Sequence, residues 1–178
     1  LFKCAPPLRT HDDVEAMWEY VEAGVFSGLA SDHSPCSYEE KHSEILGQKI
    51  ENVFDVWGGI SGIQSCVQAI YSEGVVKRGV DPTVLANAWA KLPAEAFHIY
   101  GKKGDIKVGF DADLIIIDPD KEWEITSDSL YYVNKISAFV GMKGKGLPVA
   151  TFVRGELMAE DGKLVGQKGT GQLVKRLF

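Results

Sequence analysis

The feature that most constrains the fold of this chain is a change of sequence pattern near residue 101. Before it, apolar residues recur at the spacing of amphipathic helices, most clearly over residues 63–75. After it, glycines separate short apolar runs such as residues 114–117, a pattern typical of β-strands. We therefore predict an α/β protein with two parts, a helix-containing part over residues 1–101 and a β-rich part over residues 102–178.

The first part opens with an extended segment, a helix and a short strand in succession. Residues 1–9 read as an extended segment that two prolines stop. Thr10 is a suitable N-cap for the helix that follows, and Gly24 suits its C-terminal end. Residues 25–30 are apolar and predict a short buried strand. This order is typical of α/β folds with a parallel sheet.

Further helices are predicted beyond a long polar segment. Residues 37–57 form that segment, which is either a surface excursion or a lid over a site. Ser61 and Gln64 have the spacing of a capping box at the start of the next helix. Asp81 precedes a proline and predicts the start of another helix, while Pro93 predicts the start of a shorter one.

Composition and length exclude several classes of protein. The 178 residues are too few for a complete (β/α)8 barrel, which takes about 250 residues. The net charge of −6, without a basic stripe, argues against a nucleic-acid partner, and no apolar run is long enough to span a membrane. Cys4, Cys36 and Cys66 lie far apart without a CxxC pair, which favours a reducing, cytoplasmic location over a disulfide framework.

Asp32 is the sharpest candidate for a functional residue because it lies where the predicted strand ends. Sites in parallel α/β folds gather at the carboxyl ends of strands, and a carboxylate there can bind a metal ion or take up a proton. His33, beside it, could be a second ligand. The alternative is that Asp32 only caps the loop, because Asp before Ser and Pro is common in turns.

Two backbone segments are weaker candidates for ligand binding. Gly58 and Gly59 precede a helix and could expose backbone N–H groups to a carbonyl or an anion, although a tight turn explains them equally simply. The segment around Ala5 could present a rigid backbone edge to a ligand, or could merely end a strand.

Taken together, these segments are more specific than any one of them. The chain contains, in this order, KCAPPLR (residues 3–9), ASDHSPC (30–36), WGGISGIQ (57–64), KGDI (103–106) and GFDADL (109–114). This combination resembles the C-terminal part of the allantoinase family of cyclic amidohydrolases, which are related to hydantoinases and dihydroorotases. Residues 137–142 depart from the family, which usually has a proline and an arginine in this segment.

The resemblance implies a fold and a chemistry. The family has a metal-dependent (β/α)8 TIM barrel flanked by a small β-sandwich, so residues 1–101 would be the last barrel units and residues 102–178 part of the sandwich. Asp32 matches an aspartate that binds one metal of a divalent pair, zinc being the expected metal, and that carries a proton. Backbone around Ala5 and Gly59 matches segments that hold the cyclic amide. The implied reaction is the hydrolysis of allantoin to allantoate, and the family commonly forms homo-oligomers.

The resemblance also shows what this chain lacks. It contains no His-x-His pair, and neither the metal-bridging lysine of the family nor its further histidines have a counterpart. We therefore expect the 178 residues to be a C-terminal fragment that is inactive by itself. The alternatives are a hydantoinase (dihydropyrimidinase) or dihydroorotase acting on another cyclic amide, and a non-catalytic scaffold with this fold.

Overall fold

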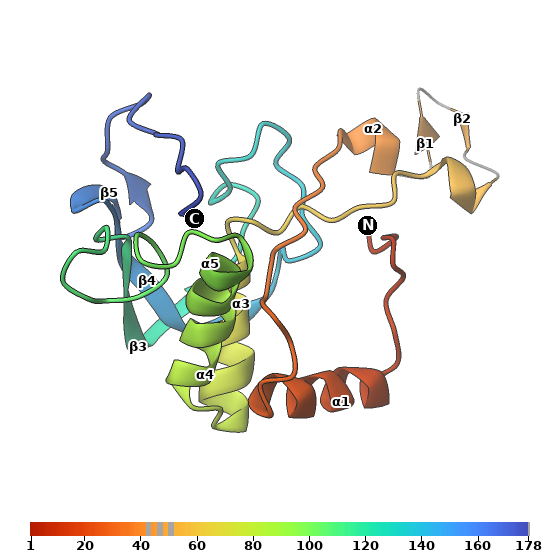
Figure 1. Ribbon diagram of the computed structural model, residues 1–178. Helices are drawn as coiled ribbons and strands as arrows, with labels where there is room; N and C mark the ends of the chain where they lie inside the picture. Colours follow the sequence, from red (N-terminus) through yellow and green to blue (C-terminus); the bar gives the residue numbers. More distant parts are fainter. Residues whose placement is uncertain (42–43, 46–47, 50–51, 178) are drawn as a thin grey trace.

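The computed structural model describes residues 1–41, 44–45, 48–49 and 52–177 (Figure 1). The lid or loop predicted over residues 37–57 therefore lies partly outside the described residues. The α-helices are α1 (His11–Glu22), α2 (Tyr38–Lys41), α3 (Cys66–Tyr71), α4 (Pro82–Ala86) and α5 (Leu92–Ala96). Short 3-10 and π-helical segments are η1 (Val53–Asp55), η2 (Ser72–Arg78) and η3 (Asn87–Lys91). The strands are β1 (Glu44–Ile45), β2 (Gln48–Lys49), β3 (Leu114–Glu124), β4 (Lys143–Val153), β5 (Glu156–Glu160) and β6 (Lys163–Leu164).

Helix α1 begins and ends where the sequence predicts. The Thr10 side chain accepts a hydrogen bond from the Asp13 backbone N–H, and the Asp13 carboxylate accepts one from the Thr10 backbone N–H, which completes a capping box. At the other end Gly24 has a φ of 67°, the left-handed conformation that glycine adopts at little cost after a helix. Both predictions, the N-cap at Thr10 and the helix end at Gly24, are confirmed. Each depends only on residues that are neighbours in the sequence.

The capping box predicted for Ser61 and Gln64 is wrong. The helix begins later, with Ser65 as the N-cap of α3, and it continues through the π-helical turns of η2. The Gln64 side chain instead donates to the backbone carbonyl of Ser129 and accepts from the backbone N–H of Tyr131, at 2.8 Å in each case. A partner from the second part of the chain thus replaces the local capping contact.

The predicted start at Asp81 is confirmed, but Pro93 does not begin a separate helix. The Asp81 carboxylate accepts from the Thr83 backbone N–H at 2.8 Å. From there α4, η3 and α5 form one continuous helical run, in which Pro93 is the second residue of α5. Because proline lacks the N–H of a regular helix, the π-helical turns of η3 directly before α5 accommodate it within the run.

The buried strand predicted over residues 25–30 is also wrong. This segment has no regular strand structure; Val25 is exposed, and the backbone N–H of Leu29 donates to the carbonyl of Ala88 in the helical run. Parallel pairing in the described part of the chain is limited to two isolated bridges, one of which joins His33 to Ile60. A single extended segment needs a neighbouring strand to form a ladder, and here its neighbour is a helix.

The second part of the chain is an antiparallel sheet in the order β3-β4-β5-β6. Strand β4 joins β5 through Arg154 and Gly155, and β5 joins β6 through Asp161 and Gly162. All four of these turn residues have positive φ, as two-residue hairpin turns require. The strands predicted near residue 114 and the tight turn at Asp161 are thus confirmed.

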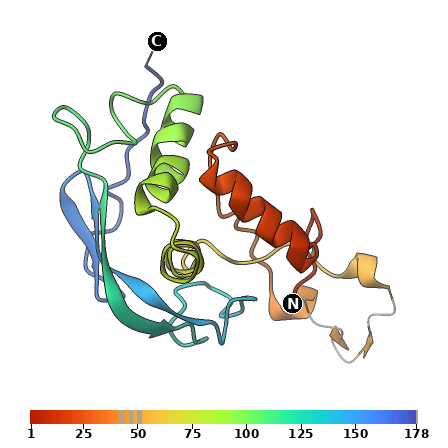
Figure 2. The same ribbon diagram turned by 90° about the horizontal axis from the view of Figure 1, so that it is seen from below.

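Helices α3, α4 and α5 lie between the sheet and α1 (Figure 2). One apolar cluster forms around Val21, Val80 and Leu85, where α1 meets the helices, and a second surrounds Trp123 and Leu130 beside the sheet. Helix α3 with η2 approaches β4 closely because glycines face it. A β-carbon at residue 144 would lie 2.3 Å from the Ser72 Oγ, and one at residue 146 would lie 2.2 Å from the Tyr71 ring.

Two further observations concern the cysteines and the length of the helices. Cys4, Cys36 and Cys66 are free thiols. No helix in the described part of the chain is long and apolar enough to cross a membrane.

Candidate active-site segment

Asp32 lies in a loop with an unusual backbone conformation. Its φ is 43°, in the left-handed region that few residues other than glycine adopt, and its side chain is exposed. Aspartate tolerates this conformation better than most residues. The surrounding structure holds the backbone here, since the next two residues are both bonded to the segment around Ile60.

His33 binds the backbone of a second segment. Its Nδ1 atom accepts hydrogen bonds from the backbone N–H groups of Gly62 at 3.1 Å and Ile63 at 3.3 Å. The centroid of its ring lies 5.0 Å from that of the Tyr132 ring. Nδ1 is occupied by the two amides and is not free to bind another group. The contacts therefore give His33 a role in fixing the loop next to Asp32.

Gly59 is buried and lies directly against the Asp32 loop. Ser34 donates its backbone N–H to the Ile60 carbonyl at 3.0 Å, and its hydroxyl accepts from the Trp57 indole at 3.2 Å. A β-carbon at residue 59 would lie 2.2 Å from the Ser34 Oγ, so only glycine allows the two segments to approach this closely. Sequence reasoning singled out Gly59 for its amides, whereas the structure shows a steric need for it.

Ala5 is exposed, in a segment that Lys41 links to Gly59. The ammonium group of Lys41 donates to the carbonyls of Lys3 at 2.6 Å, Trp57 at 2.9 Å and Gly59 at 2.5 Å. The structure therefore brings the segments of Ala5, Gly59 and Asp32 into one region, through Lys41 on one side and Ser34 on the other. Lys41 was not singled out by sequence, because a lysine in a polar, charged segment normally indicates a solvated surface.

The described residues do not complete a metal site by themselves. Asp32 offers a carboxylate, a ligand type that divalent ions accept. However, no group of three or more His, Cys, Asp or Glu side chains that could hold a metal ion is found within residues 1–41, 44–45, 48–49 and 52–177. A hydrolytic metal centre needs several such ligands on rigid elements. Asp32 therefore fits as one ligand of a larger set.

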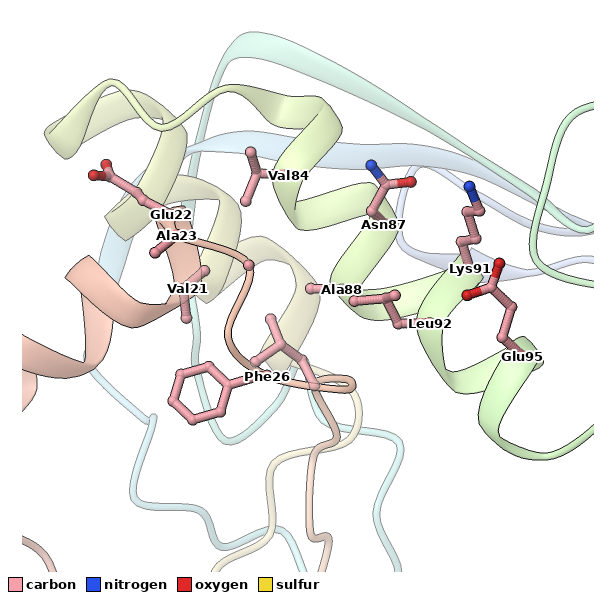
Figure 3. Close-up of a pocket in the computed structure, with 12 residues that line it drawn as sticks. Val21, Glu22, Ala23, Phe26, Val84, Asn87, Ala88, Lys91, Leu92 and Glu95 are labelled. Atoms are coloured by element: carbon pink, nitrogen blue, oxygen red, sulfur yellow. The ribbon is translucent and has the colours of Figure 1, made fainter.

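A groove lies elsewhere, between the C-terminal end of α1 and the run from α4 to α5 (Figure 3). Its volume is about 330 Å³, and its walls include Val21, Phe26, Ala88 and Leu92. The lining comes from α1, the segment after it and the helical run, and so belongs to the apolar helix–helix contact. We therefore assign the candidate site to the Asp32 loop and not to this groove.

The chain belongs to the amidohydrolase family, whose model matches residues 4–158. It is 41% identical, over 163 residues, to the allantoinase of Rubrobacter xylanophilus, a match that covers 92% of this chain and 34% of that protein. It is 35% identical, over 173 residues, to the allantoinase of Enterococcus faecalis, with 97% of this chain and 36% of that protein covered.

Solved structures of hydantoinases share the fold. The D-hydantoinase (dihydropyrimidinase) from Thermus sp. superposes with a TM-score of 0.88 at 30% identity, over 98% of this chain and 37% of that one. The L-hydantoinase (dihydropyrimidinase) from Arthrobacter aurescens superposes with a TM-score of 0.87 at 32% identity, over 98% and 38% of the two chains. The chain thus spans about a third of the length of the curated relatives it matches.

Proposed function

We propose that this chain is the C-terminal part of an allantoinase, a hydrolase that opens the cyclic amide of allantoin to give allantoate. The observation that carries the proposal is the 41% identity to an allantoinase over 92% of the chain. Two of the segments that carry the resemblance, residues 30–36 and 57–64, also lie against each other beside Asp32, and Lys41 links the segment of Ala5 to the second of them. A hydantoinase activity is the second candidate, because two solved hydantoinase structures share the fold at 30% and 32% identity.

In this proposal residues 1–101 are the last units of a (β/α)8 barrel, and residues 102–178 are part of a small sandwich. Several large apolar side chains of the first part are exposed, which favours packing against further barrel units. They include Phe2, Val14, Met17 and Val25. Burying such side chains against a neighbouring unit would be favourable. We propose further that the whole protein forms a homo-oligomer in the cytoplasm.

Asp32 would serve the reaction as a carboxylate beside the scissile bond. It is exposed, so it can reach a group outside this chain, and it can accept a proton and return it to the leaving nitrogen. A divalent metal pair, zinc being the expected one, would supply a nucleophilic water and polarise the carbonyl. Asp32 would be one ligand of that pair, and backbone around Ala5 and Gly59 would hold the edge of the amide.

The test is the turnover of allantoin, hydantoin and dihydroorotate by the whole protein that carries this chain. We expect allantoin to give the highest kcat/KM. Asp32→Ala should abolish turnover while the protein still folds, with a lower unfolding temperature because alanine tolerates the positive φ of residue 32 less well than aspartate. The control Asp128→Ala, at an exposed aspartate in the other part of the chain, should turn over allantoin like wild type. The 178 residues alone should be inactive.

Other outcomes would change the proposal. A preference for hydantoin would favour the second candidate. Absence of turnover on all three compounds in a metal-loaded whole protein would favour a scaffold role. Near-normal turnover by Asp32→Ala would remove Asp32 from the mechanism.

A further inference from the structure

We propose that Lys41 is a positioning residue that fixes the two backbone segments around Ala5 and Gly59 as one substrate-binding unit. This inference rests on the proposed function, because it gives a role to the same site. Lys41 itself has no contact with Asp32 among those found for the described residues, so its effect would act on substrate binding and not on proton transfer.

Three backbone carbonyls from different segments converge on the Nζ atom of Lys41. The Lys41 ammonium has three N–H donors, and three backbone carbonyls, of Lys3, Trp57 and Gly59, lie within 2.5–2.9 Å of it. These acceptors come from segments 38 and 16–18 residues away in sequence. One side chain therefore joins the segment before Ala5 to the turn that contains Gly59.

The burial of Lys41 makes this arrangement rigid. Only 5% of the residue is exposed, and none of the ion pairs found among the described residues includes it. Burial lowers the pKa of the ammonium, and the three carbonyl dipoles are what compensate its charge. Since a buried charge is costly unless it is hydrogen-bonded, the carbonyls cannot turn away from Lys41 without penalty.

Lys135 provides a matched comparison outside these segments. Its ammonium also binds backbone carbonyls, those of Asp128 and Leu130. Lys3 cannot serve as the control, because its own ammonium links the segment of Ala5 to the residues before Gly59. If loss of any lysine that binds backbone carbonyls weakens the enzyme, Lys135 and Lys41 should matter in the same way. If the position of Gly59 matters for the substrate, only Lys41 should affect binding.

The experiment compares Lys41→Met, Lys41→Arg and the control Lys135→Met in the whole protein, with allantoin as the substrate. For Lys41→Met we expect KM to rise about tenfold or more while kcat, per folded enzyme, stays within about threefold. Lys135→Met should leave KM within about twofold. Lys41→Arg keeps the charge but not the spacing of its donors, and should give an intermediate KM. An unchanged KM in Lys41→Met, or equal effects of Lys41→Met and Lys135→Met, would overturn the proposal.

A second measurement keeps the proposal testable if Lys41→Met does not fold or if the proposed function fails. Failure of the function appears as absence of turnover in the wild type. Hydrogen exchange of residues 57–62 then decides: faster exchange in Lys41→Met than in Lys135→Met supports the tether, and equal exchange contradicts it. If Lys41→Met is unfolded, Lys41→Arg takes its place, and a wild-type KM with wild-type exchange in that variant overturns the proposal.

Discussion

Gly59 packs so closely on Ser34 that a β-carbon at residue 59 would lie 2.2 Å from the Ser34 Oγ and 2.5 Å from its Cβ. The contact joins the loop that carries Asp32 to the turn that carries Gly59, and the Ser34 backbone bonds the same turn through Ile60. The two segments are therefore held together by a steric fit as well as by hydrogen bonds.

Gly59→Ala should destabilise the protein through this contact. The added methyl group must displace Ser34 or the turn, which is an overpacking cost of about 1–3 kcal/mol. We expect a lower midpoint of urea unfolding and, in the whole protein, a loss of activity. The matched control is Gly58→Ala, because the nearest atom to a β-carbon there is the Lys3 Cε at 4.0 Å. Equal stability of the two variants would contradict the prediction, because it would mean that Ser34 moves aside for the added methyl group without an energetic cost.

Thr10→Ala should destabilise α1. The Thr10 hydroxyl accepts from the Asp13 backbone N–H at 3.3 Å and also bonds the Asp13 carboxylate at 2.7 Å. Loss of an N-cap costs about 1 kcal/mol. Thr10→Ser retains the hydroxyl and should unfold close to the wild-type urea midpoint. A Thr10→Ser variant as unstable as Thr10→Ala would assign the effect to the methyl group of Thr10 instead.

Asp105 should make stability depend on pH at the acid end. Hydrogen bonds from the Lys107 ammonium and the Tyr100 hydroxyl lower the pKa of its carboxyl to about 2. Since the ordinary value is about 3.9, the stabilisation is present above about pH 4 and is lost as the pH falls toward 2.

The variant Asp105→Asn tests this dependence through melting temperatures measured between pH 6 and pH 2. The difference between wild type and Asp105→Asn should be constant at the upper end and should shrink below pH 4. Tyr100→Phe removes one of the two donors to Asp105. The melting-temperature difference between wild type and Tyr100→Phe should therefore also shrink below pH 4, but by less than for Asp105→Asn. A difference that stays constant down to pH 2 would contradict the role of Asp105.

Leu130→Ala should be the most destabilising of these substitutions. Leu130 is 1% exposed and packs with Trp123 and Ile125 beside the sheet. Removing a buried leucine side chain costs about 2–5 kcal/mol, because the lost contacts leave a cavity. Leu173 is 89% exposed, so Leu173→Ala should leave the urea midpoint unchanged. Similar midpoints for both variants would mean that the cluster around Leu130 collapses into the space.

Features set by neighbouring residues were predictable from the sequence. The cap at Thr10, the helix start at Asp81 and the turn at Asp161 are local, and each follows from the preference of a residue for one backbone conformation or one hydrogen bond. The family was also predictable, because its motifs are contiguous strings of residues. The roles of Asp32, Ala5 and Gly59 remain proposals.

Features that depend on partners far away in sequence were decided only by the tertiary structure. The Gln64 side chain makes no local capping contact and instead bonds the backbone of Ser129 and Tyr131. Residues 25–30 form no strand, because they lie against a helix. Lys41 shows the reason most clearly. Its own sequence context indicates a solvated surface, yet three distant carbonyls surround its ammonium, and only the folded chain brings them to one point.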